Sequence, residues 1–468
     1  MTSDTGTEDL ITHLKSVLLE LNAHPYPDVA NPPETPKRAS VALILRIQPH
    51  YSHWPATDDK PFPLHHPYPP SPAQQRRPSS AASSKPHHLS FNDTVEAFFA
   101  QDWVKHGDPE LLFIKRATRV GDKWNGHVAL PGGKRDPEDE DDQVTAVREA
   151  LEEVGIDLNY NNAIAVGNLP QRVVTSSWGK VPLMVLCPYI YLLTSPTYPA
   201  QCLQPTEVAS THWVSLHALQ SPSLRTHEYA DVSARLAKSE LGIKRWFLQS
   251  MLSKMMFAAI HLVPSNSTYC ATIPDFIPAG GPPDAGALGM LRDVLRGPEG
   301  NKAGKSPPPL LLWGLTLGVV SDLLEHLPPH NALELWTYPT FTNWDVRFIM
   351  WAMSYRFRAQ KAVEMSTQAT LALETSSVPI LDAEVGENPG EVGIAGLGVG
   401  RSWGRTSRAK MVARNVAVNS MLEGYYPIMR KAVATALAAR IGLVVGLAVV
   451  LSKKYRLWEW MRSLREKA

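Results

Sequence analysis

An acidic stretch between Leu130 and Leu158 constrains the fold of this chain more than any other part of its sequence. It reads LPGGKRDPEDEDDQVTAVREALEEVGIDL, a glycine pair followed by a run of acids and then by residues with helical spacing. Gly155 stands where a glycine commonly ends a helix. We therefore expect a helix over residues 143–154, with the glycine pair forming a tight turn that passes close to a ligand.

The carboxylates near the end of this helix oppose its stability. One side of the helix is expected to be an apolar stripe formed by Val144, Val147, Leu151 and Val154. The opposite face carries three glutamates at helical spacing, which are Glu149, Glu152 and Glu153. Like charges repel, and the C-terminal end of a helix disfavours anions. A divalent cation accounts for the arrangement, because Mg²⁺ prefers carboxylate oxygens and bridges to substrate phosphates. From these three residues alone, a solvated acidic face is an equal alternative.

Further charged residues surround the three glutamates. Arg148 precedes Glu152 by four residues and is placed to orient it. The preceding loop adds negative charge through Asp136, Glu138, Asp139, Glu140, Asp141 and Asp142.

The string REALEEVGI, Arg148–Ile156, resembles the signature of Nudix hydrolases. That signature is Gly, five residues, Glu, seven residues, Arg-Glu-apolar-any-Glu-Glu-any-Gly-apolar. Counting back from Arg148 aligns Glu140 with the signature acid and Lys134 with its glycine. Gly133 is one residue early, which indicates a one-residue insertion in the loop, at little cost.

Two longer strings resemble the coenzyme A diphosphatase-like branch of this family. They are GGKRDPEDEDDQVTAVRE and, upstream, LLFIKRATRVGDKWNGHVALPGG. The second departs from the branch at His127, where Gln is frequent, and at Leu130, where Phe is usual. Once insertions are removed, the resemblance covers residues 38–327.

The resemblance implies an α/β fold, a Nudix α/β/α sandwich. It also implies cleavage of the diphosphate of coenzyme A or its derivatives to 4′-phosphopantetheine and adenosine 3′,5′-bisphosphate, with Mg²⁺ or Mn²⁺ as cofactor. The metal ligands are then Glu149, Glu152 and Glu153. The catalytic residues are Arg148, Glu152 and Glu153, and which glutamate is the base stays open. The substrate-binding residues are Gly132, Gly133, Lys115, Arg116 and His127.

Other interpretations of the same residues are kept. Lys115, Arg116, Arg119 and Lys123 are candidates to contact a 3′-phosphate, or they form a solvated strand flank. Glu207 is a candidate late carboxylate, although an ordinary surface glutamate is favoured. Arg172 either contacts phosphate or flanks a strand. The alternative functions are an 8-oxo-dGTP-type housecleaning diphosphatase and an inactive Nudix-fold membrane scaffold. The intact Arg148 and its three glutamates argue against the inactive form.

Apolar runs predict the remaining organisation. Strands are expected at residues 38–47, 110–117, 180–193 and 210–216, and a strand leading into a helix at 310–327. Helices are expected near the N-terminus and at 242–262. Residues 1–36 are an N-terminal helix and linker, and 37–327 form the Nudix domain. Pro-rich segments at about 50–90 and 263–309 are predicted disordered insertions.

Composition excludes several other classes of function. The formal net charge of +1 gives no reason to expect nucleic-acid binding. Without a paired spacing, Cys187, Cys202 and Cys270 are interpreted as buried, reduced thiols. The first Pro-rich segment contains a histidine tract whose irregular spacing argues against metal binding, made of His50, His53, His65, His66, His87 and His88.

The last 141 residues lie outside the resemblance. Residues 328–427 are an aromatic-rich segment and a polar, basic linker. Residues 428–468 are a predicted transmembrane helix and basic tail, because the apolar run 432–451 is long enough to span a bilayer. Arg440, near its middle, costs about 2.5–3.5 kcal/mol on insertion. We expect an intracellular protein, tail-anchored in an organelle membrane such as that of a peroxisome or mitochondrion, with the Nudix domain in the cytosol.

Overall fold

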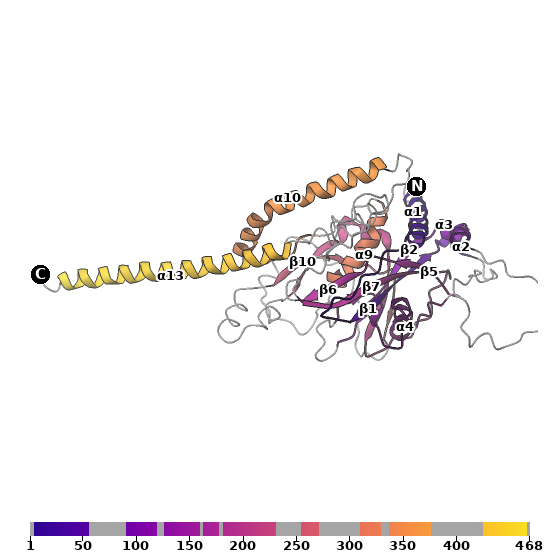
Figure 1. Cartoon of the computed structure of the whole chain (residues 1–468), viewed down its shortest axis with the longest axis horizontal. Coiled ribbons are helices and arrows are strands. Elements are labelled where there is room, and N and C mark those ends of the chain that lie inside the picture. The colour runs from indigo at the N-terminus through magenta and orange to yellow at the C-terminus, as the bar shows by residue number, and fades with distance from the viewer. Residues whose placement is uncertain are drawn as a thin grey trace, which may run out of the picture.

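The computed structural model describes nine ranges of the chain. These are residues 4–55, 90–118, 126–159, 162–176, 181–230, 254–270, 309–328, 337–375 and 425–465. Within them the protein has an α/β body from which one long helix projects (Figure 1). Several predicted features lie outside these ranges, namely most of both insertions, Arg119, Lys123, the polar linker and the histidines from His65 to His88.

The central sheet is built around β1 (Arg38–Gln48), which pairs antiparallel with β2 (Asp108–Arg116) and parallel with β7 (Val181–Leu193). Its strand order in the described residues is β11-β8-β2-β1-β7-β5, with β3 on β2, β4 on β1 and β6 on β7. The other members are β3 (Val128–Ala129), β4 (Gly132–Lys134), β5 (Ala163–Asn168), β6 (Arg172–Ser176), β8 (Val208–Ser215) and β11 (Asn266–Tyr269). The four strands predicted from apolar runs are confirmed.

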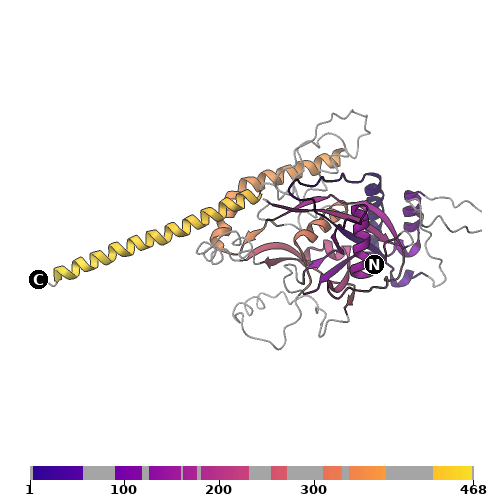
Figure 2. The ribbon, with the colours of Figure 1, turned by 60° about the horizontal axis from the view of Figure 1, so that its bottom comes forward.

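Both faces of this sheet are covered, which explains why β1 is an almost continuous apolar run. On one face, Leu43 and Leu45 pack in a core with α1 (Asp4–Ala23), α2 (Phe91–Phe99) and α9 (Gly314–His326). On the other face, Ala42 and Ile44 pack under α4 (Asp142–Val154). Figure 1 shows α4 across the sheet from α1, and Figure 2 shows the same body from another side, with the yellow helix α13 projecting from it. The predicted α/β/α sandwich is confirmed, and the predicted N-terminal helix belongs to its core.

A second, smaller sheet is formed by strands that follow β8, and β11 of the first sheet lies between its strands in the sequence. Its strands are β9 (Arg225–Ala230), β10 (Met255–His261), β12 (Leu311–Trp313) and β13 (Thr340–Phe341). The helix predicted over residues 242–262 is therefore wrong for residues 255–261, and residues 242–253 lie outside the described ranges. A short apolar run does not distinguish strand from helix, and here pairing of β10 with three other strands decides for the strand.

Two further predictions need correction. Residues 266–269, expected in a disordered insertion, form the edge strand β11, which pairs with β8. Cys187 and Cys270 are buried free thiols, but Cys202 is exposed. Short helical turns complete the described elements: η1 (Tyr51–His53), α3 (Asp102–Lys105), α5 (Leu216–Gln220) and η3 (Pro222–Leu224).

His212 of β8 makes the edge formed with β11 sensitive to acid. Its two ring nitrogens lie 2.8 Å from Ser210 Oγ and 2.7 Å from Ser267 Oγ. Burial, together with the charge of Lys115, lowers the pKa of His212 from 6.5 to about 4. The folded protein therefore keeps this ring neutral where the unfolded chain protonates it.

We expect the protein to lose stability as the pH falls from about 6.5 to about 4. In this window the unfolded state binds more protons at His212, so the free energy of unfolding falls with the pH. The shift corresponds to on the order of 3 kcal/mol at its limit. Urea denaturation at several pH values measures this slope. The His212→Asn variant should have a flatter profile over the same window, and an equally steep one would show that other groups cause the loss.

The C-terminal part contains two long helices, α10 (Trp344–Thr375) and α13 (Tyr425–Arg465), which pack on β10. Met429 and Ala432 of α13 are buried in this contact, so the predicted segment 428–468 begins inside a helix that is partly core. Arg440 pairs with Asp345 of α10, with Nε 2.5 Å from Oδ2 and Nη2 2.6 Å from Oδ1. Arg440 was expected near the middle of an apolar span, but this ion pair places it where α13 leaves the protein body.

Candidate active site

The helix α4 carries the acidic residues and is fixed at both ends by its own sequence. At its start, the Asp141 side chain accepts a hydrogen bond from Val144 N at 2.7 Å, which caps the first turn. At its end, Gly155 has φ 74° and ψ 14°, the left-handed conformation that glycine adopts without strain. The predicted helix and its terminating glycine are confirmed.

The buried face of α4 differs from the predicted apolar stripe. Ala146, Ala150 and Val154 face the sheet, whereas Val144 and Leu151 are exposed. Small alanines allow the helix to approach the strands closely, and this close approach carries Glu153 into the interface as well. The three glutamates therefore do not share one solvated face: Glu153 is buried, Glu149 is half-buried and Glu152 is exposed.

Glu153 is held by the glycine pair. Its Oε2 accepts a hydrogen bond from Gly132 N at 2.9 Å. The pair forms β4 against β1, instead of the predicted tight turn. A side chain at Gly132, where φ is 153°, would clash with the backbone of Ser40 and Val41. A Cβ at Gly133 would collide with the Glu149 carboxylate, so this glycine leaves room for that carboxylate.

The electrostatics of these two glutamates favour a bound cation. Burial raises the pKa of Glu153 to about 8, and the charges of Glu149 and Glu207 add to this shift. The Gly132 N–H and the charge of Arg116 oppose the shift without cancelling it. Burial also raises the pKa of Glu149, although Arg148 opposes the rise. A cation at this place would offset the repulsion among the carboxylates and displace a proton.

Arg148 links the acidic loop to the helix. Its Nε and Nη2 donate to the two carboxylate oxygens of Asp139 at 3.0 and 2.9 Å. Its Nη1 lies 3.2 Å from Glu149 Oε1 and 3.0 Å from Glu152 Oε2. The bidentate contact lowers the pKa of Asp139 to about 2. Arg148 is therefore anchored on Asp139 and positions both Glu149 and Glu152. The contact with Glu152 was predicted.

Asp139, instead of Glu140, is the acid that anchors this arginine. Glu140 is exposed and offers its backbone carbonyl to Arg135 Nη2 at 2.7 Å. Five residues separate Gly133 from Asp139, so the spacing from glycine to acid is intact. The extra residue falls between Asp139 and Arg148, where the chain turns into α4.

Several acids of the loop before α4 form structural contacts, although the sequence predicts only that they add negative charge around the glutamates. Asp141 caps α4, and Asp142 pairs with Arg38 of β1, with Nη2 2.6 Å from Oδ2. Arg135 also approaches Asp142, at 3.4 Å. These contacts fasten the start of α4 to the sheet and leave fewer acids available to a ligand.

The sequence favours an ordinary surface residue at Glu207 over a late carboxylate, but its charge acts on the glutamates of α4. Its charge raises the pKa of both Glu149 and Glu153, and its carbonyl accepts a hydrogen bond from Ala117 N at 2.8 Å. It follows β7 in the chain and immediately precedes β8. Only the pairing of β8 with β2 brings it to the carboxylates of α4.

The family comparison matches residues 103–236 to the NUDIX domain. An uncharacterized Nudix hydrolase of Photorhabdus laumondii is 30% identical over 153 residues, which cover 33% of this chain and 74% of that protein. The chain belongs to the Nudix hydrolase family. An uncharacterized protein of Schizosaccharomyces pombe is 34% identical over 256 residues, covering 53% of this chain and 67% of that protein.

The resemblance to coenzyme A diphosphatases is narrower. The peroxisomal coenzyme A diphosphatase of Mus musculus is 38% identical over 84 residues, or 18% of this chain. The chain spans only 34% of that relative's length. The central Nudix strand β1 lies before the matched residues, because the long connection from 49 to 107 separates it from β2.

The Nudix site gathers some of the predicted substrate-binding residues and separates others. The charge of Arg116 acts on Glu153 and lowers the pKa of its carboxyl group. Lys115 precedes it on β2 and acts on His212, on the sheet face opposite α4. His127 packs on Trp313, with ring centroids 4.9 Å apart. Arg172 is buried at the start of β6 in an ion pair with Asp322 of α9, which favours the structural alternative over the phosphate contact.

The residues of this Nudix site fit a divalent metal ion. Carboxylate oxygens are the ligands that Mg²⁺ and Mn²⁺ take, and the charges of Glu149 and Glu207 both act on Glu153. Arg148 connects Glu152 to Glu149. A Cβ at Gly133 would fill the space that one of these carboxylates occupies. Glu149, Glu152 and Glu153 would hold the ion, and Arg148 would keep Glu149 and Glu152 in place.

Proposed function

We propose that the protein hydrolyses the diphosphate of coenzyme A or its derivatives to 4′-phosphopantetheine and adenosine 3′,5′-bisphosphate. The observation that carries the hydrolytic part is the arrangement of the three glutamates. Glu153 is held by Gly132 N, Glu149 lies against Gly133, and Arg148 contacts both Glu149 and Glu152. The substrate rests on the strings around Leu111–Gly133, which resemble the coenzyme A branch, and on the similarity to a coenzyme A diphosphatase.

Each residue has a role in this proposal. Glu149, Glu152 and Glu153 hold Mg²⁺ or Mn²⁺, which when bound polarises a phosphoryl oxygen and lowers the pKa of a water. Arg116 contacts the diphosphate from the end of β2. Arg148 orients Glu149 and Glu152 through the contacts described above. One of the glutamates takes the proton from the attacking water.

Selectivity must come from groups beyond the carboxylates, because the diphosphate is common to many substrates. A cationic contact to the 3′-phosphate is typically worth about 1.5–3 kcal/mol, or roughly 10- to 150-fold in affinity. Arg148 is bound to Asp139, Glu149 and Glu152, whereas the charge of Arg116 acts on Glu153. Lys115 acts on the opposite face of the sheet.

We expect kcat/KM for coenzyme A to exceed that for dephospho-coenzyme A by roughly 10- to 150-fold. The measurement compares coenzyme A, dephospho-coenzyme A and 8-oxo-dGTP side by side in Mg²⁺, with both products identified. A Glu153→Gln preparation, purified in parallel, reports contaminating phosphatase activity. A preference of tenfold or more for 8-oxo-dGTP would replace coenzyme A with the housecleaning substrate.

We further propose that the protein associates with a membrane through α13. By length and composition alone, the helix segment Tyr425–Arg456 could cross a bilayer, although its first turns also pack in the core with α10. From Ile441 onward the apolar side chains are exposed, and Leu443 reaches 70%. The neighbouring helix α10 presents exposed aromatic residues on one face, namely Trp344, Phe348, Trp351 and Tyr355. Such rings favour the interface between lipid and water.

We expect removal of residues 441–468 to release the protein from membranes without loss of hydrolysis. A cut at 428 is unsuitable, because Met429, Ala432 and Ala436 belong to the core that joins α13 to α10. A Leu443→Arg/Leu447→Arg variant keeps the length and adds about 2.5–3.5 kcal/mol per charge to insertion. High-speed centrifugation without detergent measures the partition. A soluble full-length protein would refute membrane association.

A further inference from the structure

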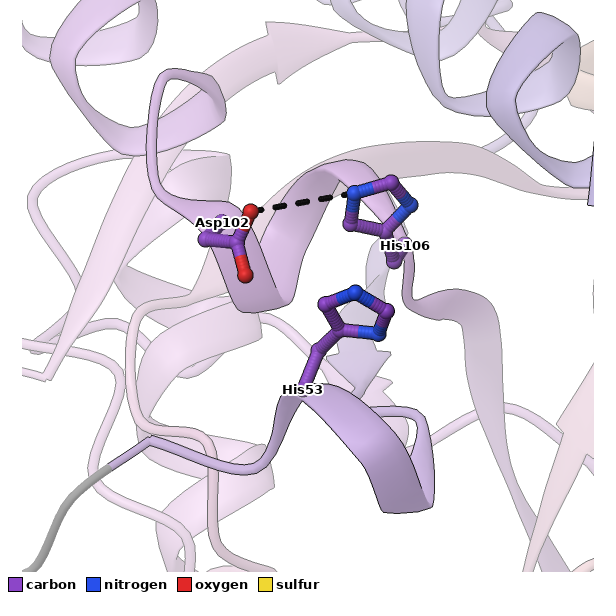
Figure 3. A group of neighbouring side chains, drawn as sticks. All are labelled: His53, Asp102 and His106. Carbon is purple, nitrogen blue, oxygen red and sulfur yellow. Dashed lines mark ion pairs between the residues drawn. The ribbon is translucent and has the colours of Figure 1, made fainter.

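A second group of metal-binding side chains lies away from the carboxylates of α4. It consists of His53 from η1 and of Asp102 and His106 from α3 and the residue after it (Figure 3). One ligand atom from each residue lies within 4.8 Å of the other two. The imidazoles of His53 and His106 are stacked with ring centroids 4.1 Å apart, and His106 Nε2 is 3.7 Å from Asp102 Oδ1. Both histidines are half-buried, and Asp102 is exposed.

The sheet register explains how residues 49 positions apart meet. β1 and β2 pair antiparallel, with Gln48 opposite Asp108. The residues that follow β1 therefore lie beside the residues that precede β2, which places η1 against α3. Asp102 and His106 are four residues apart, so one helical turn brings their side chains to the same side. The three residues thus lie where the connection between β1 and β2 begins and ends.

The chemistry of the three residues suits a transition metal better than Mg²⁺. Two imidazole nitrogens and one carboxylate oxygen are a common ligand set for Zn²⁺, with a water in the fourth position. Tetrahedral Zn²⁺ holds neighbouring ligand atoms roughly 3.3 Å apart. The three ligand atoms already lie within 4.8 Å of one another, so small side-chain rotations would bring them to this separation, and the exposed Asp102 can move most easily.

Neighbouring hydrogen bonds orient one of the histidines. Ser52 Oγ lies 2.8 Å from His53 Nδ1 and 2.8 Å from His50 Nδ1. A partner on Nδ1 leaves Nε2 as the ligand atom of His53, the arrangement usual for a metal-bound histidine. Sequence spacing gave no signal for this group, because only His53 belongs to the histidine tract. The other two ligands follow the Pro-rich segment.

We propose that His53, Asp102 and His106 bind one Zn²⁺ ion, separate from the hydrolytic metal of the Nudix site. Bound there, the ion fastens η1 to α3 and holds the two ends of the β1–β2 connection together. Because the three ligands meet only in the folded chain, the ion binds the folded state in preference to the unfolded one, and binding therefore stabilises the fold. This role is structural and does not require the protein to hydrolyse any substrate.

The test measures Zn²⁺ binding to the full chain, without an affinity tag, by equilibrium dialysis in excess Mg²⁺. Excess Mg²⁺ competes with Zn²⁺ for the carboxylate site. We expect the wild type to bind one equivalent that His53→Gln and His106→Gln each lose, with affinity reduced about 100-fold or more. His24→Gln, an exposed histidine elsewhere, is the matched control and should bind as the wild type does.

A second measurement separates loss of binding from loss of folding. Thermal unfolding in EDTA should give the same midpoint for wild type, His53→Gln and His106→Gln, and added Zn²⁺ should raise only that of the wild type and of His24→Gln. Asp102→Asn keeps the helix turn and should show an intermediate affinity. Equal binding by the wild type and both histidine variants would place the metal elsewhere, and no binding by the wild type would also overturn the proposal.

Discussion

Replacement of Glu153 by Gln should lower kcat by about 10³-fold or more while the fold stays intact. Glutamine keeps the carbonyl oxygen that accepts the Gly132 N–H, so the packing of α4 on β4 is preserved. The substitution removes the negative charge that Mg²⁺ or Mn²⁺ requires. Glu152→Gln should also lose several powers of ten if Glu152 is the base, although it is exposed and bound to Arg148.

The matched control for these variants is Glu140→Gln. It makes the same change in the same acidic stretch, at a residue whose side chain is exposed. Steady-state kinetics with saturating Mg²⁺, together with circular dichroism, measures both activity and fold. Full activity in Glu152→Gln and Glu153→Gln, or full wild-type activity in EDTA, would exclude the metal-dependent mechanism.

Truncation of Arg172 to Ala should destabilise the protein by about 3–5 kcal/mol. Arg172 of β6 and Asp322 of α9 form an ion pair that is almost completely buried. Removal of the arginine leaves the Asp322 carboxylate without its charged partner, in the core that joins α9 to the sheet. Urea denaturation measures the change in the free energy of unfolding.

Two comparisons isolate the cause of this loss. An Arg172→Met/Asp322→Leu variant removes both charges and should recover most of the stability, because an apolar pair does not pay for desolvation. Lys15→Ala removes one member of the exposed pair Lys15–Glu96 and should cost less than about 1 kcal/mol. A loss in Arg172→Ala no larger than that in Lys15→Ala would show that the buried pair contributes little.

The sequence by itself determined the elements whose signals are local. Gly155 ends the helix because glycine adopts a positive φ easily, and helical spacing identifies the set of glutamates. Apolar runs identify the strands of the central sheet. Arg148 could be assigned to Glu152 for the same reason, since residues four apart on a helix are neighbours. These features depend on short-range geometry that the order of residues already specifies.

Only the tertiary structure decided which distant residues meet. Pairing of β8 with β2 brings Glu207 to Glu153, and alternation along β2 separates Lys115 from Arg116. Packing of α4 through its alanines buries Glu153, against the predicted stripe. Sheet register brings His53 to His106. Such contacts depend on strand register and helix packing, which are set by the whole fold and leave no periodic signal in the sequence.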